Sequence, residues 1–254
     1  MELRTIGINV ETQNLQKFQN FISLGYFCDV AKELEKLGLR SFSGPFDWNI
    51  SSLNGVISAI ENNFVGYLDY DCLQQNKYYR KRYKNVRYDI AFFHDFSAYR
   101  SLASQIESVK DKYNRRIDKF YRVTEKPTLF IRYIIDNDEL LYISENIDRI
   151  ESLIKSRNPD SDILFITSLK STPNTIRSYF VAPDQNDVVS RHPITDNPVL
   201  RTVFSSIDIP EKELNLRFFA KKEHPSLIDK SRKYLPKIID KIFREEYHHN
   251  STYE

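Results

Sequence analysis

The sequence predicts an α/β protein with a mainly parallel sheet flanked by helices. Two short, fully apolar runs at 128–135 and 162–167 are typical of strands that are buried on both sides. Between them, apolar residues recur at helical spacing from Leu140 to Ile154. This strand–helix–strand order is typical of parallel strands that are joined by crossover helices.

The beginning of the chain predicts a further strand and two helices. The apolar run at 21–24 predicts a strand, and helical spacing over 29–37 predicts the helix that follows it. A second amphipathic helix begins at Leu53, with Ser51 or Ser52 as its cap. The remaining segments are a polar lead-in at 1–19, with room for a short edge strand at 8–10, and a loop at 39–48.

The rest of the chain is assigned from the same patterns. We expect a single α/β domain over 20–245, with an irregular, basic and tyrosine-rich insertion around 64–88 that forms a hairpin or a long loop. The other predicted segments are a strand at 88–93, a helix at 102–120, a strand at 178–182, a polar stretch at 183–198, a final helix at 227–242 and a flexible tail at 246–254.

Composition narrows the class of protein. The 254 residues are 41% hydrophobic and 28% charged, with a net charge of +2, so the chain is not a polycation. It has no apolar run near the ~20 residues of a membrane span, and 1–19 has no signal-peptide core. Two cysteines, Cys28 and Cys72, indicate a reducing cytoplasm rather than a disulfide framework. No zinc spacing or glycine-rich phosphate loop occurs, so we expect no metal and no cofactor.

The segment 22–31 holds the first candidate for chemistry. An apolar strand runs into Gly25, which permits a sharp turn, and Cys28 follows where helical spacing begins. Unpaired N–H groups and the helix dipole favour a thiolate in the first turn of a helix, so Cys28 is a candidate nucleophile. The alternative is that Cys28 is a small buried hydrophobe of the core.

His94 is the candidate base. It directly follows an apolar strand, and side chains at the carboxyl ends of strands line the ligand crevice in open α/β sheets. The alternative is that His94 caps the next helix. In the loop before residue 49, Asp47 could orient an imidazole or bind a substrate hydroxyl, or it could cap the next turn. Trp48, the only tryptophan, could plug the core or line the site.

Basic residues give two further signals. Arg132 lies inside an apolar strand, so it meets a carboxylate or an anionic ligand, or else lies at an exposed sheet edge. The stretch 77–87 interleaves basic residues with tyrosines and suits a polyanion, and Arg116 belongs to a basic stripe on the helix at 102–120. The near-zero net charge favours a solvated surface, so a nucleic-acid partner is unlikely.

These residues fit one family pattern. The segments that carry the resemblance are Ser-Leu-Gly-Tyr-Phe-Cys-Asp-Val-Ala at 23–31, Leu-Arg with Ser-Gly-Pro-Phe-Asp-Trp at 39–48, His-Asp-Phe at 94–96, 113–117 and 130–132. Over residues 20 to 170 the chain resembles the "putative papain-like cysteine peptidase" family of poorly characterised bacterial proteins. The resemblance implies Cys28 as the nucleophile, His94 as the base, and Asp47 or Asp95 as the carboxylate that orients it.

The resemblance supports a site rather than a papain architecture. The histidine comes 66 residues after the cysteine, and strands alternate with helices. A strand–turn–nucleophile–helix opening is closer to hydrolases and acyltransferases with a flavodoxin-like or SGNH-hydrolase-like three-layer fold than to a true papain fold. Proteins similar to this family tend to occur beside surface-polysaccharide enzymes, which implies a glycan or acyl substrate.

The sequence therefore predicts a cytoplasmic enzyme that transfers or hydrolyses an acyl group through a Cys28 thioester, with His94 as base and acid. The residues expected to hold the substrate or its oxyanion are Ser23, Gly25, Trp48, Arg116 and Arg132. One alternative is a binding module in which Cys28 is core packing and the basic stretch grips an anionic glycan or nucleic acid. A second alternative is a transferase acting on phosphorylated sugars, whose phosphate the arginines would hold.

Overall fold

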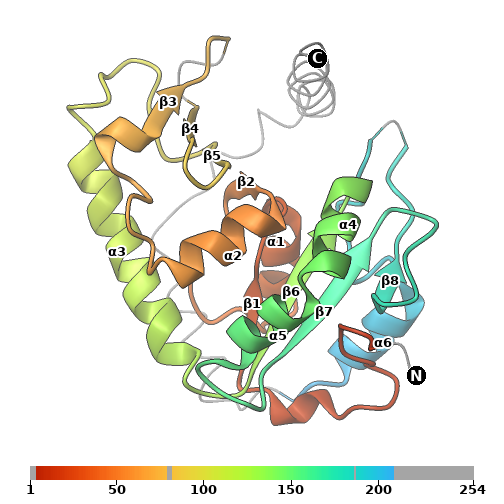
Figure 1. Ribbon diagram of the computed structural model, residues 1–254. Helices are drawn as coiled ribbons and strands as arrows, with labels where there is room; N and C mark the ends of the chain where they lie inside the picture. Colours follow the sequence, from red (N-terminus) through yellow and green to blue (C-terminus); the bar gives the residue numbers. More distant parts are fainter. Residues whose placement is uncertain (1–3, 79–81, 186, 209–254) are drawn as a thin grey trace.

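The computed structural model describes residues 4–78, 82–185 and 187–208. It is a mixed α/β structure with two separate sheets (Figure 1). The larger sheet has the strand order β1-β6-β7-β8, and all neighbouring strands are parallel, which confirms the predicted strand–helix–strand alternation. Its strands are β1 (Asn20–Ser23), β6 (Thr128–Ile134), β7 (Asp162–Thr167) and β8 (Ser178–Phe180).

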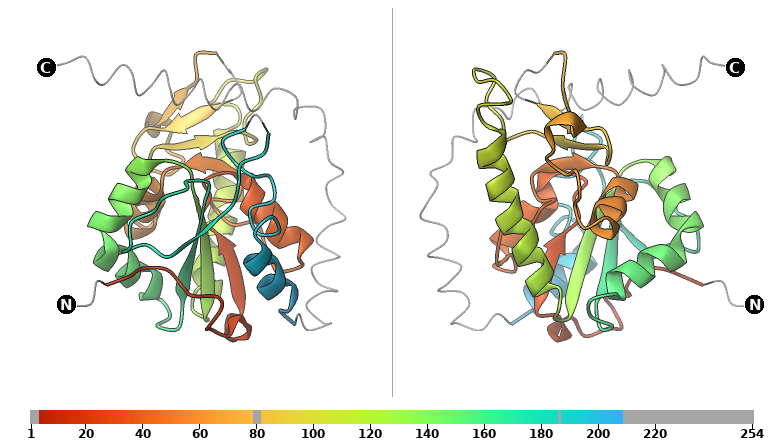
Figure 2. Two further views of the ribbon diagram at one scale, coloured as in Figure 1. Left: turned by 90° about the vertical axis from the view of Figure 1, so that its right-hand side faces the viewer. Right: turned by 60° about the vertical axis from the view of Figure 1, so that its left-hand side comes forward.

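Helices cover both faces of the parallel sheet because its strands are apolar on both sides. Alternate residues of β6 point to opposite faces: Leu129 and Ile131 pack with α1 and α6, and Phe130 and Ile134 pack with the other helices. Figure 2 shows these two groups of helices on either side of the sheet. The helices are α1 (Cys28–Lys36), α2 (Leu53–Glu61), α3 (Ile106–Val123), α4 (Asn137–Glu145), α5 (Ile147–Lys155) and α6 (Pro198–Ser205).

A second, antiparallel sheet lies above the carboxyl ends of the parallel strands in Figure 1 and was not predicted. Its order is β2-β5-β4-β3, and it gathers the predicted strand near 88–93 together with the tyrosine-rich insertion, which does form a hairpin. The Ser51 N–H donates to the Tyr26 carbonyl just after β1, at 3.2 Å, and so ties the two sheets together. The elements are β2 (Asn49–Ser51), η2 (Tyr70–Cys72), β3 (Leu73–Gln75), β4 (Tyr83–Asn85) and β5 (Ile90–Phe92).

The start of the chain is part of the core rather than a polar lead-in. Ile6, Ile8 and Val10 are almost wholly buried, and Ile6 forms a parallel bridge with Ile176, beside the sheet rather than at the predicted 8–10 edge strand. A short 3-10 helix, η1 (Leu15–Lys17), leads into β1. The sequence did not predict this burial, because isolated apolar residues in an irregular segment show neither strand nor helix spacing.

Three further predictions have definite outcomes. Ser52 is the cap of α2 and accepts the Gly55 N–H, as predicted. The helix predicted from Leu140 to Ile154 is two helices, α4 and α5, which meet at Asn146. The predicted helix at 227–242 and the tail at 246–254 lie outside the described residues. Within the described ranges, no helix is long and apolar enough to cross a membrane.

Candidate active site

The chain turns sharply between β1 and α1, and this turn places Cys28. Gly25 has a φ of +84°, a backbone conformation that side chains other than glycine rarely adopt. A Cβ at this position would lie 2.6 Å from the Ser51 hydroxyl oxygen, so the space is also closed to alanine. The Gly25 N–H donates to the Ser23 hydroxyl at 3.1 Å. Cys28 is then the first residue of α1, and its N-cap, Phe27, offers the helix no side-chain hydrogen bond.

Arg132, on β6, holds this turn in place through hydrogen bonds to the Leu24 carbonyl and to Ser51. Its side chain is wholly buried, and its Nε and Nη2 donate to the two carboxylate oxygens of Glu139 at 2.7 and 2.5 Å. Nη2 also donates to the Ser51 carbonyl at 2.6 Å. Nη1 donates to the Leu24 carbonyl at 2.9 Å and to the Ser51 hydroxyl at 3.2 Å. Arg132 thus joins β1, β2 and α4.

These contacts decide between the roles expected for Arg132. Because every guanidinium N–H already has an acceptor, Arg132 has no donor left for an oxyanion. The alternative that it meets a carboxylate is what the structure shows. The Gly25 N–H is likewise engaged by Ser23, which leaves the N–H groups at the start of α1 as the donors near the thiol.

Cys28 is buried, with 1% of its surface exposed, and it lies among the apolar side chains on the α1 face of the sheet. Its Sγ is 4.0 Å from Oδ1 of Asp29. Burial, followed by the charge of Asp29, raises the pKa of the Cys28 thiol to about 11, and Lys32 and Arg191 oppose this shift. In this closed arrangement burial therefore favours the neutral thiol, whereas the start of a helix by itself favours a thiolate.

A segment from the end of the described chain closes over the start of α1. We call residues 187–196 the strap. Nη1 of its Arg191 bonds Oδ2 of Asp29 at 3.1 Å, and Nη2 bonds Oδ2 of Asp187 at 2.6 Å. One turn further along α1, the buried carboxylate of Glu33 accepts the N–H groups of Ile194 and Thr195 at 2.8 and 2.9 Å. Two carboxylates of α1 thus hold the strap next to Cys28.

His94 reaches the same region from the other sheet. It is exposed and lies two residues after the end of β5, so it follows an antiparallel strand and not, as expected, a strand of the parallel sheet. The Phe27 and Phe93 rings, which precede Cys28 and His94, meet edge to face at 6.3 Å. The Trp48 ring meets the His94 imidazole in the same way at 6.4 Å. The structure therefore brings the segments of Cys28, His94 and Trp48 together.

The two candidate orienting carboxylates are both engaged elsewhere. Oδ2 of Asp47 accepts Nε of Arg40 and the Gly44 N–H, each at 2.8 Å, and so closes the loop before Trp48. Asp95 is paired with Lys112 and accepts the Tyr113 hydroxyl at 2.9 Å. These contacts give both aspartates a structural role, whatever they do in catalysis.

The basic residues are divided between core and surface. The Arg82 guanidinium is buried over the Phe93 ring, 4.1 Å from its centre, and Lys84 pairs with Asp89 at 2.6 Å, so part of the stretch 77–87 holds the antiparallel sheet. Residues 79–81 lie outside the described residues. Arg116 packs over the Tyr113 ring at 4.8 Å, on α3.

Sequence reasoning missed Asp29, Glu33, Glu139 and Arg191. One signal was available for Glu139: a charged residue inside an apolar strand needs a partner, and the next helix offers a glutamate in its first turn. Asp29 and Glu33 are four residues apart, so they share a face of α1, but this looks like an ordinary solvated face. Nothing local indicates that the strap covers it. In the part of the chain that the structure describes, no group of three His, Cys, Asp or Glu side chains could hold a metal ion.

The structure is thus a mixed α/β protein with a cysteine at a strand-to-helix turn and a histidine segment packed against it. The chain belongs to the "putative papain-like cysteine peptidase" family, whose family model matches residues 19–170. It is also 31% identical over 171 residues to the uncharacterised protein R408 of Acanthamoeba polyphaga mimivirus, a match that covers 58% of this chain and 76% of the viral protein. No solved structure matches the chain. The strap lies after the residues that the family model matches.

Proposed function

We propose that the protein is a cysteine-dependent enzyme, an acyl hydrolase, acyltransferase or peptidase, with Cys28 as nucleophile and His94 as base. One observation carries the proposal. The turn at Gly25 delivers Cys28 to the first turn of α1, and the Phe27–Phe93 contact brings the His94 segment to that turn. Family membership agrees with this chemistry but names no substrate.

The proposed reaction has two steps. The His94 imidazole takes the proton of the Cys28 thiol, and the sulfur bonds to the carbonyl carbon of an acyl group. The N–H groups at the start of α1 donate to the oxygen of the tetrahedral intermediate. When this intermediate collapses, the bond to the leaving group breaks and His94 returns the proton to it. Water or a second acceptor, deprotonated by His94, then releases the acyl group from the thioester.

The reaction requires the strap to move. Cys28 is buried, so the sulfur must become accessible before it can attack. Arg191 links Asp29 to the strap through charge-assisted hydrogen bonds, so displacing Arg191 would uncover the side of α1 next to the thiol.

Several further roles belong to the proposal. The edge contact with Trp48 positions the His94 ring, and Asp47 supports that contact indirectly through Arg40, whose guanidinium also lies over the Trp48 ring at 5.1 Å. We propose Asp47 or Asp95 as the carboxylate group that supports the imidazole. The proposed substrate is an acyl or glycan ester. We propose that the enzyme acts in the cytoplasm and in the metabolism of surface polysaccharides.

The experiment is alkylation of Cys28 by iodoacetamide as a function of pH, in a Cys72→Ser background. We expect His94→Ala to slow the reaction near neutral pH by about tenfold, because general-base assistance is lost. Tyr99→Ala, which removes an exposed ring, is the control and should leave the rate unchanged. An equal rate with and without His94 would refute the pair.

A second candidate function is supported by the burial of Cys28. A thiol with 1% exposure and a raised pKa is also what inert core packing requires, which favours a binding module for an anionic glycan or nucleic acid. If Cys28 stays unreactive until the protein unfolds, the binding-module proposal replaces the enzyme proposal. Its own test is binding of heparin at increasing salt, which should weaken steeply and be lost when Arg80 and Arg87 are neutralised.

A further inference from the structure

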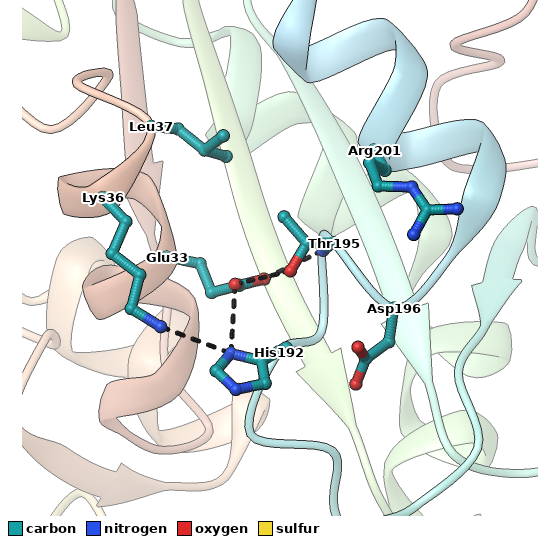
Figure 3. A pocket seen from close by; sticks show the side chains of 7 residues that line it. All are labelled: Glu33, Lys36, Leu37, His192, Thr195, Asp196 and Arg201. Atoms are coloured by element: carbon teal, nitrogen blue, oxygen red, sulfur yellow. Dashed lines mark hydrogen bonds and ion pairs between the residues drawn. The ribbon is translucent and has the colours of Figure 1, made fainter.

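A hollow lies between α1, the strap and α6. Its volume is about 390 Å³, within the range of small-molecule sites. Figure 3 shows the polar side chains that line it from three elements, with the Lys36 ammonium turned toward His192 beside α1 and Arg201 on the other side, on α6. They are Glu33 and Lys36 of α1, His192, Thr195 and Asp196 of the strap, and Arg201 of α6.

The acidic residues of this hollow are already satisfied. Glu33 is buried, and its Oε2 accepts two N–H groups of the strap while Oε1 accepts the Thr195 hydroxyl at 2.8 Å. Oδ2 of Asp196 accepts the Ser190 hydroxyl at 2.6 Å. These hydrogen bonds fix the wall of the hollow and spread the charge of Glu33 over several donors.

The basic residues are not satisfied in the same way. Lys36 and Arg201 are exposed, and neither forms an ion pair with any residue that the structure describes. The Lys36 ammonium instead lies 3.3 Å from Nδ1 of His192. Two cations from different helices therefore line one hollow without an ion pair among the described residues, although the carboxylates of Glu33 and Asp196 line it as well.

The position of His192 adds a conflict that a ligand would remove. Its Nδ1 is 3.3 Å from the Lys36 ammonium and 3.4 Å from Oε1 of Glu33. Nδ1 can accept from Lys36 only when it carries no proton, and it can donate to Glu33 only when it carries one. Both contacts cannot be hydrogen bonds at once. An anion that bound the Lys36 ammonium would remove this competition for Nδ1.

We propose that this hollow is a binding site for the phosphoryl group of a small phosphorylated ligand, held by Lys36, His192 and Arg201. Lys36 and Arg201 supply two cationic donors and His192 supplies a ring N–H, and arginine and lysine are the usual phosphate ligands. The remaining oxygen of Asp196 can accept a hydroxyl of the ligand. This site is separate from Cys28 and stands whether or not Cys28 is a nucleophile.

The test is a titration of the full chain, labelled at histidine, with inorganic phosphate at constant ionic strength and pH 7.5, followed by NMR. We expect a saturable change in the His192 ring signals, because His192 lines the hollow. Lys36→Gln and Arg201→Gln should each raise the dissociation constant about tenfold, since each removes a charge-assisted contact. Lys155→Gln on α5, at the opposite face of the sheet, is the matched control and should change nothing.

Three results would overturn the proposal. One is a response to chloride as large as the response to phosphate, and another is phosphate binding that survives both glutamine variants. Acetate binding as tight as phosphate binding would refute the phosphoryl assignment. A hexose phosphate that binds more tightly than inorganic phosphate, with Asp196→Asn removing the difference, identifies a phosphorylated sugar as the source; equal binding identifies free phosphate.

Discussion

The two sides of the strap differ in how their charges are used. On the side of Cys28, Asp29, Arg191 and Asp187 form a closed chain of ion pairs, and the thiol beneath is buried. On the other side, Lys36 and Arg201 face an open hollow without a carboxylate partner among the described residues. One segment therefore seals the first region and lines the second.

This difference indicates two roles for charged side chains in this protein: some stabilise the fold, and others are available to bind a ligand. Where a guanidinium is bound to carboxylates of the protein, as with Arg132 and Arg191, its charge stabilises the fold or closes a surface. Where donors remain unused at a hollow, they are available to a ligand. The comparison predicts that substitutions on the two sides will change different measured quantities.

The largest effect is expected at the buried pair below the Gly25 turn. Arg132→Met should lower the free energy of unfolding by about 3–5 kcal/mol, because it leaves the buried Glu139 carboxylate without its partner. Urea denaturation measures this change. Arg149→Met is the matched control: its pair with Glu61 is about one-third exposed, so the loss should stay below about 1 kcal/mol. Equal losses in the two variants would contradict the assignment of Arg132 as the link between the sheets.

The next effect is a pH dependence of stability carried by Cys28. Its pKa in the folded protein is about 11, above that of an exposed thiol, so the folded state keeps its proton longer than the unfolded state. Cys28 therefore makes its full contribution to the stability of the folded state below about pH 8.5, and this contribution is lost as the pH rises toward 11. Denaturation at several pH values should show a loss of about 1–3 kcal/mol that is missing in Cys28→Ala. Parallel pH profiles for the two proteins would show that the thiol is not desolvated.

Arg191→Gln should act on access rather than on chemistry. It removes the cation that ties Asp29 to Asp187, and we expect alkylation of Cys28 to become about tenfold faster in the Cys72→Ser background. The comparison variant is Arg177→Gln, whose guanidinium bonds the Gly7 carbonyl and no other described residue. An unchanged rate for Arg191→Gln would show that the strap does not limit access, and would leave the proposed nucleophile intact.

The sequence was sufficient to predict those strands and helices whose apolar residues repeat at regular spacing. β6, β7 and α1 repeat apolar residues at strand or helix spacing, so their places follow from burial alone. The antiparallel sheet was missed because β2 and β4 have three residues each, too few to show alternation. Ile6 and Ile8 were missed for a related reason: they anchor an irregular segment.

The candidate site divides in the same way. Cys28 was placed correctly at the start of a helix because Gly25 and the apolar run before it are local signals. The closure over it was not predictable, because Asp29 and Arg191 are 162 positions apart and their pairing exists only in the folded chain. Burial raises the pKa of the Cys28 thiol and so favours its protonated form, which no local pattern could reveal.

The smallest effect on stability is expected in the open hollow, and it is the sharpest test of the comparison. Lys36→Gln and Arg201→Gln should change the free energy of unfolding by less than about 0.5 kcal/mol, because neither cation neutralises a carboxylate of the described chain. Urea denaturation measures this with and without phosphate. Phosphate should stabilise the unchanged protein through binding to its folded state, and this gain should disappear in both variants. A large loss of stability without phosphate would mean that Lys36 and Arg201 hold the fold, as Arg132 does, and are not kept free for a ligand.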